Sequence, residues 1–185
     1  MNINMEDREN YIAFLQGDMQ GFERLVIKYK DHLIYFLQTY VKNITVAEDL
    51  AQDVFVDVLI YKERFQLEKQ FKTYLFTIGK HKAIDFLRKQ RYFTSMEEIE
   101  WLEDCQQLEE VLFQKENNTL LLTALHQLKR EYRQIITLID LEEMSYKEAG
   151  IILDKTVPQI KILIYRARKS LKKQLIKVGY CYEEQ

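Results

Sequence analysis

Hydrophobic positions in the first part of the chain recur with the spacing of a helix and not of a strand. Between Met19 and Val41 they follow the i, i+3, i+4 rule of an amphipathic helix. The pattern predicts one long helix over this span, with its apolar face turned to a core. The positions of that face are Phe22, Leu25, Val26, Tyr29, Leu33, Phe36, Leu37 and Tyr40.

Two further helices are predicted to complete a bundle with this one. Thr45 and the acidic residue three positions later form a capping-box pattern, which favours a helix from there to about Arg64. An apolar series that begins at Phe71 predicts a third helix to about Arg91. With a short segment around Tyr11 to Leu15, these helices are expected to form the first domain.

The segment 92–115 separates this bundle from a second one. It has weak periodicity, contains no Lys or Arg from Thr94 through Gln114, and is rich in acidic residues, so we expect a linker. Leucine and isoleucine positions beyond it predict a smaller helical core. The expected fold is all-α, with one helical domain over 1–91, an acidic linker over 92–115 and a second helical domain over 116–185.

Two capping boxes lie close together in the second domain. Ser145 with Glu148 opens one short helix, and Thr156 with Gln159 opens the next. Pro158 falls in the first turn of the later helix, where its missing N–H costs nothing. This spacing predicts two helices joined by a tight corner, as in a helix-turn-helix.

Charge is strongly segregated although the net charge is only -2. From Lys155 to Tyr182 there are basic residues and no acidic ones, and the basic residues recur on one helical face. Such a stripe suits the major groove because cations neutralise phosphates while the start of the helix reaches base edges; a merely solvated face is the alternative. The candidate duplex contacts are Gln159, Lys161, Ile162, Tyr165, Arg166, Arg168, Lys169 and Lys172.

The helix that follows Thr45 has the opposite charge. No basic residue occurs between Lys42 and Lys62, while carboxylates repeat along one face. Like charges repel each other, so we interpret this face as complementary to a basic partner, with simple solubility as the alternative. The helix from Phe71 is instead basic and interleaved with aromatic residues, which suits unpaired bases that stack.

Three strings in this order resemble one family. Ala47–Phe55, Phe71–Arg88, and Ser145–Glu148 with Tyr165–Arg168 are similar to segments of bacterial extracytoplasmic-function (ECF) sigma factors, over nearly the whole chain. The resemblance implies a sigma region 2 bundle that binds core RNA polymerase and melts the minus-ten element. It also implies a sigma region 4 helix-turn-helix that reads the minus-thirty-five element of promoter DNA, a cytoplasmic location and an anti-sigma factor as a further partner.

The resemblance also assigns roles to residues of the first domain. The family's loop that holds a flipped base of the non-template strand falls here between Phe65 and Lys69. The implied polymerase contacts are Glu48, Asp49, Gln52, Asp53 and Phe55. The implied minus-ten contacts are Phe65, Gln66, Leu67, Glu68, Lys69, Tyr74, Lys80, His81 and Arg88.

This chain departs from the family pattern at three places. The family usually has Trp where Tyr74 stands and Asn where His81 stands. The usual Gly-Thr-Val-Lys-Ser-Arg string is replaced here by Pro158–Leu163, with apolar residues at two normally polar positions. The minus-thirty-five preference of the family therefore does not transfer, and Ile162 is a candidate contact for a thymine methyl group.

Other classes of protein fit the sequence less well. A helix-turn-helix regulator whose first domain senses a ligand or dimerises leaves the acidic helix unexplained. A helical adaptor that acts only through protein contacts leaves the basic stripe unexplained. Apolar runs near the N-terminus are interrupted by Asp18 and Glu23, so neither a signal peptide nor membrane insertion is expected.

The residues that enzymes and metal sites require are scattered. His32, His81 and His126 are isolated, and the five glycines form no phosphate-binding loop. Cys105 and Cys181 have no second ligand at zinc spacing. We therefore expect no enzymatic activity, no cofactor and no metal ion.

Overall fold

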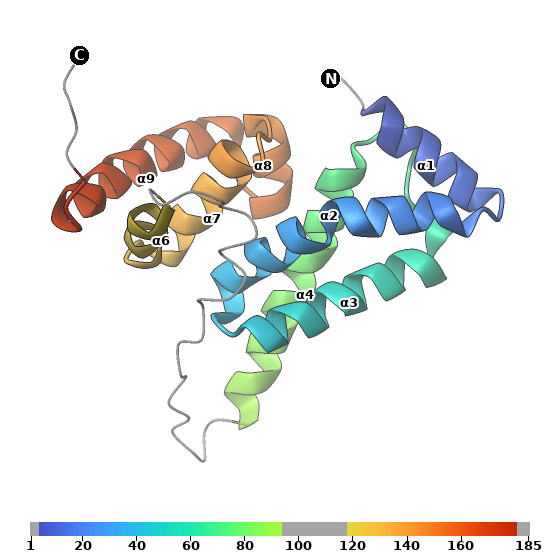
Figure 1. Cartoon of the computed structure of the whole chain (residues 1–185), viewed down its shortest axis with the longest axis horizontal. Helices are drawn as coiled ribbons and strands as arrows, with labels where there is room; N and C mark the ends of the chain where they lie inside the picture. The colour runs from blue at the N-terminus through green and yellow to red at the C-terminus, as the bar shows by residue number, and fades with distance from the viewer. Residues whose placement is uncertain (1–3, 94–117, 181–185) are drawn as a thin grey trace. The chain divides into compact units, whose positions relative to one another are not determined.

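Helices make up all the regular secondary structure of residues 4–93 and 118–180, which are the residues described by the computed structural model. The chain divides into two units, Met1–Asp104 and Cys105–Gln185, each of which is described by itself (Figure 1). The predicted all-α class is confirmed. No described helix combines the length and the apolar character needed to cross a bilayer.

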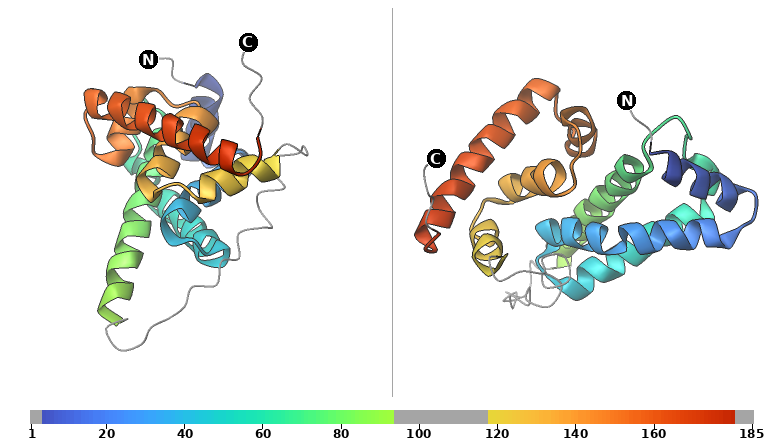
Figure 2. Two further views of the ribbon diagram at one scale, coloured as in Figure 1. Left: turned by 90° about the vertical axis from the view of Figure 1, so that its left-hand side faces the viewer. Right: turned by 45° about the horizontal axis from the view of Figure 1, so that its top comes forward.

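The first unit is a helical bundle. It consists of α1 (Met5–Leu15), α2 (Met19–Val41), α3 (Ile44–Ile60), a single 3₁₀ turn η1 (Lys62–Arg64) and α4 (Phe71–Phe93). Helix α2 is central and packs against α1, α3 and α4 (Figure 2). The core of the unit therefore forms around α2.

Helix α2 has the bounds that its apolar spacing predicts. Its N-cap, Asp18, accepts a hydrogen bond from the backbone N–H of Gln20 at 2.9 Å, and Lys42 ends it in the left-handed conformation with φ 54°. The first half buries one face, but every residue from Leu33 to Val41 is buried. Because both α3 and α4 pack on α2, its last turns lack a solvent face.

Helix α3 begins earlier than predicted. Its N-cap is Asn43, whose side chain accepts from the backbone N–H of Val46 at 3.0 Å, so the expected cap at Thr45 is wrong. Asn is among the best N-cap residues, and Asn43 precedes Thr45 along the chain, so it starts the helix first. The helix also ends at Ile60, and Arg64 belongs to the separate turn η1.

Helix α4 extends beyond Arg91, where the sequence pattern places its end. Tyr92 and Phe93, assigned to the linker, are still helical, and neither is a helix-breaking residue. The remainder of the predicted acidic linker, 94–115, lies outside the described residues.

The second unit is smaller and is built around its last helix. It consists of α6 (Asn118–His126), α7 (Arg130–Ile136), a π-helical turn η3 (Thr137–Leu141), α8 (Tyr146–Leu153) and α9 (Val157–Lys177). Helix α9 packs against α6, α7 and α8. The deeply buried core residues of this unit include Leu125, Ile135, Leu138, Ala149, Ile152, Ile160, Ile164 and Ala167.

Candidate nucleic-acid interface

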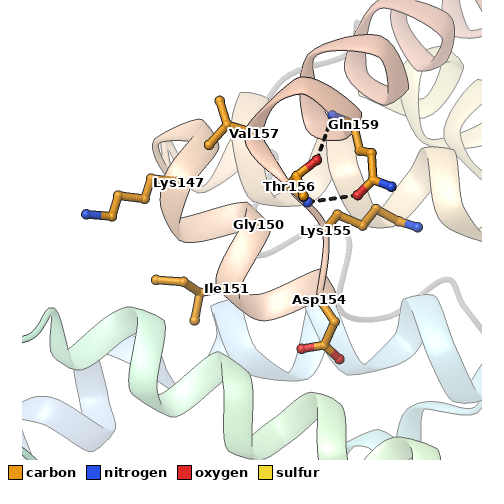
Figure 3. Close-up of a pocket in the computed structure, with 8 residues that line it drawn as sticks. All are labelled: Lys147, Gly150, Ile151, Asp154, Lys155, Thr156, Val157 and Gln159. Atoms are coloured by element: carbon orange, nitrogen blue, oxygen red, sulfur yellow. Dashed lines mark hydrogen bonds between the residues drawn. The ribbon is translucent and has the colours of Figure 1, made fainter.

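Both predicted capping boxes are present at the corner between α8 and α9. Ser145 accepts from the Glu148 N–H at 3.3 Å, and its own N–H donates to the Glu148 carboxylate at 2.9 Å. Thr156 and Gln159 exchange the equivalent bonds at 3.4 and 2.8 Å (Figure 3). Each box satisfies backbone donors that the helix itself leaves open, so the two helix starts are fixed locally.

The turn between the two helices passes close to Gly150 of α8. Asp154 ends α8 with φ 52°, and the Lys155 N–H donates to the Gly150 carbonyl at 2.9 Å. A Cβ added at Gly150 would lie 2.6 Å from the Lys155 carbonyl oxygen. An open depression of about 460 Å³ lies at the same corner and is lined in part by Lys147 and Thr156 (Figure 3).

Helix α9 has one buried and one exposed face, as the charge pattern predicts. Ile160, Ile164 and Ala167 are buried, whereas Ile162 and Tyr165 are 54% and 68% exposed. An isoleucine so exposed at the start of a basic helix contributes nothing to the core. The exposed candidates for DNA contact are Gln159, Lys161, Ile162, Tyr165, Arg166, Arg168, Lys169 and Lys172.

Arg168 belongs to that exposed face but is already engaged. Its Nε donates to Asp140 Oδ2 at 3.2 Å, and its terminal nitrogen donates to the other carboxylate oxygen. The hydrogen bond to Asp140 raises the pKa of the guanidinium, with a smaller contribution from Tyr146. Arg168 is predicted as a contact for the DNA duplex, whereas in the structure its guanidinium is paired with a carboxylate of η3.

The acidic face of α3 is exposed near its middle. Asp49 and Asp53 lie on the surface, and neither has an ion-pair partner within the described parts of the chain. Asp57, one turn further on, is bonded to Lys82 of α4 at 2.8 Å. Asp49 and Asp53 are therefore available to a basic partner surface of the kind that the acidic pattern of this helix predicts.

A largely apolar groove of about 310 Å³ lies beside these carboxylates, between α2 and α3. Glu48 and Gln52 line it together with Phe55, which is buried and packs edge-on against Phe22 with 6.4 Å between ring centroids. Val56 and Leu59 also line the groove and are exposed. All five predicted polymerase contacts thus lie on or beside one surface of α3, with Phe55 inside it.

Two of the predicted minus-ten contacts are in the core. Phe65 is 7% exposed and packs against Tyr11, Phe71 and Tyr74, and Lys80 is 4% exposed. Their expected role as DNA contacts is therefore corrected, because burial removes both side chains from the surface. The ring of Tyr74 is half-buried, with its centroid 5.1 Å from that of Phe65.

The rest of the minus-ten set is accessible. Leu67 is half-buried, and Arg88 is exposed and forms an ion pair with Asp85 at 3.3 Å. Tyr11 of α1 packs against Phe65 at the start of this loop, a contact that the sequence does not predict. No local pattern links a residue to a loop so far along the chain. The exposed members are Gln66, Glu68, Lys69, His81 and Arg88.

Two family matches cover most of the described chain. Sigma-70 region 2 matches residues 25–92, and sigma-70 region 4 matches residues 118–171. The first range covers most of the first bundle and the second covers most of the second. Each bundle therefore corresponds to one region of a sigma factor.

Curated relatives and solved structures agree with these matches. The ECF RNA polymerase sigma factor SigW of Bacillus subtilis is 29% identical over 171 residues, covering 86% of this chain and 91% of SigW. The RNA polymerase sigma factor YlaC of the same organism is 30% identical over 161 residues, covering 85% and 93%.

Two solved structures share the fold. CnrH in complex with the cytosolic domain of CnrY is 23% identical, with a TM-score of 0.66 over 93% of this chain and 98% of CnrH. RpoE of Bartonella quintana in complex with the anti-sigma factor NepR is 24% identical, with a TM-score of 0.66 over 85% and 98%. From both family matches and from the relatives that span nearly its whole length, the chain belongs to the sigma-70 family as an ECF RNA polymerase sigma factor.

Proposed function

We propose that this sigma factor divides promoter recognition among three surfaces of its two bundles. The acidic face of α3 binds core RNA polymerase. The loop 66–69 and the exposed face of α4 contact the melted minus-ten strand, and α9 reads the minus-thirty-five duplex. The observation that carries the proposal is the segregation of exposed charge, acidic on α3 and basic on α9.

Polymerase binding is supported by the surface around Asp49 and Asp53. Their carboxylates are exposed and without an ion-pair partner among the described residues, and the apolar groove between α2 and α3 runs beside them. A partner that offers apolar side chains next to basic ones would fill the groove and neutralise the carboxylates together. Charge complementarity of this kind favours fast and oriented docking.

Duplex recognition is supported by the exposed face of α9. The Gln159 side-chain oxygen accepts the Thr156 N–H, which leaves the amide NH₂ group to donate to a base edge. Ile162 offers an apolar contact for a thymine methyl group. Lys161, which precedes Ile162 along α9, and Lys169, about two turns after it, supply cations for DNA phosphates.

The proposal also covers a regulatory partner, the cellular location and the absence of catalysis. The solved relatives are bound to the anti-sigma factor NepR and to the cytosolic domain of CnrY, and we propose that an anti-sigma factor likewise holds this chain. We also propose that the protein acts in the cytoplasm, where polymerase is found. It has no catalytic role of its own, because a sigma factor directs the chemistry of the polymerase.

Charge reversal on α3 tests the proposal. Asp49→Lys and Asp53→Lys should each abolish capture by immobilised core polymerase, while far-ultraviolet circular dichroism stays unchanged because both side chains are exposed. Glu9→Lys reverses an exposed charge on α1 and serves as the matched control. Unchanged affinity in both α3 variants would contradict the proposal.

A further inference from the structure

Helix α1 lies outside the region 2 match, which starts at residue 25, yet it contacts the connection between α3 and α4. That connection runs from Tyr61 to Gln70 and includes the loop proposed to hold the melted strand. The right-hand view of Figure 2 shows it passing beside α1. Contacts at the start, the middle and the end of the connection join the two segments.

The first contact fixes the start of the connection. The hydroxyl of Tyr11 donates to the backbone carbonyl of Lys62 at 2.8 Å, across 51 residues of sequence. Tyr11 is completely buried. A phenol is protonated at neutral pH and able to donate, and burial, with smaller contributions from Tyr74 and Glu63, raises the pKa of this one further.

Two further contacts fix the middle and the end of the connection between α3 and α4. The rings of Tyr11 and Phe65 pack edge to face with 4.7 Å between centroids, and Phe65 also packs against Phe71 at 5.5 Å. At the far end the backbone N–H of Asn4, the N-cap of α1, donates to the Gln70 side-chain oxygen at 3.2 Å. Residues 66–69 are therefore held on both sides.

Helix α1 is itself firmly attached to α2, so it can act as a fixed support. Lys28 bonds to Asp7 at 2.7 Å, and Tyr29 donates to the same carboxylate. Arg24 donates to the Asn10 side chain at 2.6 Å. At Gly21 an added Cβ would lie 2.3 Å from a carbonyl oxygen of α1, so the two helices approach as closely as glycine permits.

We propose that Tyr11 is a positioning residue for promoter melting: its hydroxyl and ring hold the connection between α3 and α4 so that residues 66–69 present a fixed surface to single-stranded DNA. The inference rests on the proposed role of that loop. It gives α1 a part in recognition, although α1 contributes none of the proposed DNA contacts. Loss of the hydroxyl bond alone should loosen the loop, since the Lys62 carbonyl would lose its partner.

Tyr11→Phe is the decisive variant because it removes one oxygen atom and keeps the ring. Thr39→Val is the matched control: it removes a buried hydroxyl that donates to the Phe36 carbonyl at 2.6 Å within α2. In the full chain, hydrogen exchange is followed at the backbone N–H of Lys69, which donates to Gln66 at 2.9 Å inside the loop. We expect exchange about two- to tenfold faster in Tyr11→Phe, the effect of one net hydrogen bond, and unchanged in Thr39→Val.

The same variants are then assembled with core polymerase and assayed for promoter opening by permanganate reactivity. Opening should fall by a similar factor in Tyr11→Phe, while binding to a minus-thirty-five duplex stays the same. A third variant with Gln66, Glu68 and Lys69 all changed to Ala tests the loop directly. Normal opening by this triple variant would refute the loop's proposed role; reduced opening there with wild-type exchange and opening in Tyr11→Phe would refute the inference about Tyr11.

Discussion

The Asp140→Asn substitution should reveal whether Arg168 is held away from DNA by its own domain. The two side chains form a bidentate pair between α9 and η3, with Nε and Oδ2 3.2 Å apart. Asn keeps the size of Asp140 and removes its charge. The variant therefore releases the guanidinium with little change in packing.

The cost in stability should be small. The Arg168 side chain is 52% exposed and that of Asp140 is 30% exposed, so solvent screens the pair. Ion pairs of this kind contribute about 0.2–1 kcal/mol. The free energy of unfolding should fall by at most about 1 kcal/mol, and the variant should stay folded.

The effect on DNA binding should be larger and should depend on salt. Each phosphate that a protein cation neutralises adds about 0.9 to the slope of log affinity against log salt concentration. One added contact therefore changes affinity by about three- to fourfold between roughly 50 and 200 mM salt. Asp140→Asn should steepen the slope by up to about one unit and tighten binding to any duplex at low salt.

A double-mutant cycle read by fluorescence anisotropy at several salt concentrations tests this reasoning. Arg168→Ala should leave the slope nearly unchanged in the wild-type background and should remove the added unit in the Asp140→Asn background. Lys169→Ala is the control, because this lysine is exposed and without an ion pair among the described residues, and it should lower the slope in both backgrounds. If Arg168→Ala lowers the wild-type slope as much as Lys169→Ala does, the guanidinium leaves Asp140 on binding and the reasoning is refuted.

Two further predictions concern the helix-turn-helix. Ile162→Ala should relax the preference for one base pair by about 1–3 kcal/mol, as measured by selection from a random duplex pool. Lys169→Ala is the control and should weaken binding to all duplexes alike. An unchanged preference in Ile162→Ala would mean that this side chain does not face the bases. Gly150→Ala should lower the free energy of unfolding by about 1–3 kcal/mol, measured by urea denaturation, because the added Cβ would meet the Lys155 carbonyl oxygen. Lys147→Ala on the same helix is the control and should have little effect. Equal stability of the two variants would show that the turn tolerates a side chain at residue 150.

Several features that depend on near neighbours in sequence are correctly predicted. The bounds of α2, both capping boxes around the corner and the two faces of α9 all follow from residues within about one helical turn of each other. Asn43 and Thr45 mark the limit of such reasoning. Both suit a helix start, and the choice between them sets the first turn of α3.

Which side chains remain at the surface is decided by segments far apart in the chain. The family resemblance makes Phe65 a minus-ten contact, but its packing against Tyr11 of α1 makes it part of the core. Arg168 has a basic, outward position on α9, yet Asp140, 28 residues earlier, pairs with it.

The sequence by itself therefore determined an all-α chain with a helix-turn-helix, an acidic helix and a basic helix, because periodicity, caps and charge are local properties. Only the tertiary structure decided that Tyr11 of α1 bonds to the connection between α3 and α4 and that Lys80 is buried. A helical pattern predicts which face of a helix is apolar, but it does not predict against which other helix that face packs. The packing partner of each face depends on how all the helices of the bundle fit together, and it determines which side chains contact one another at the site.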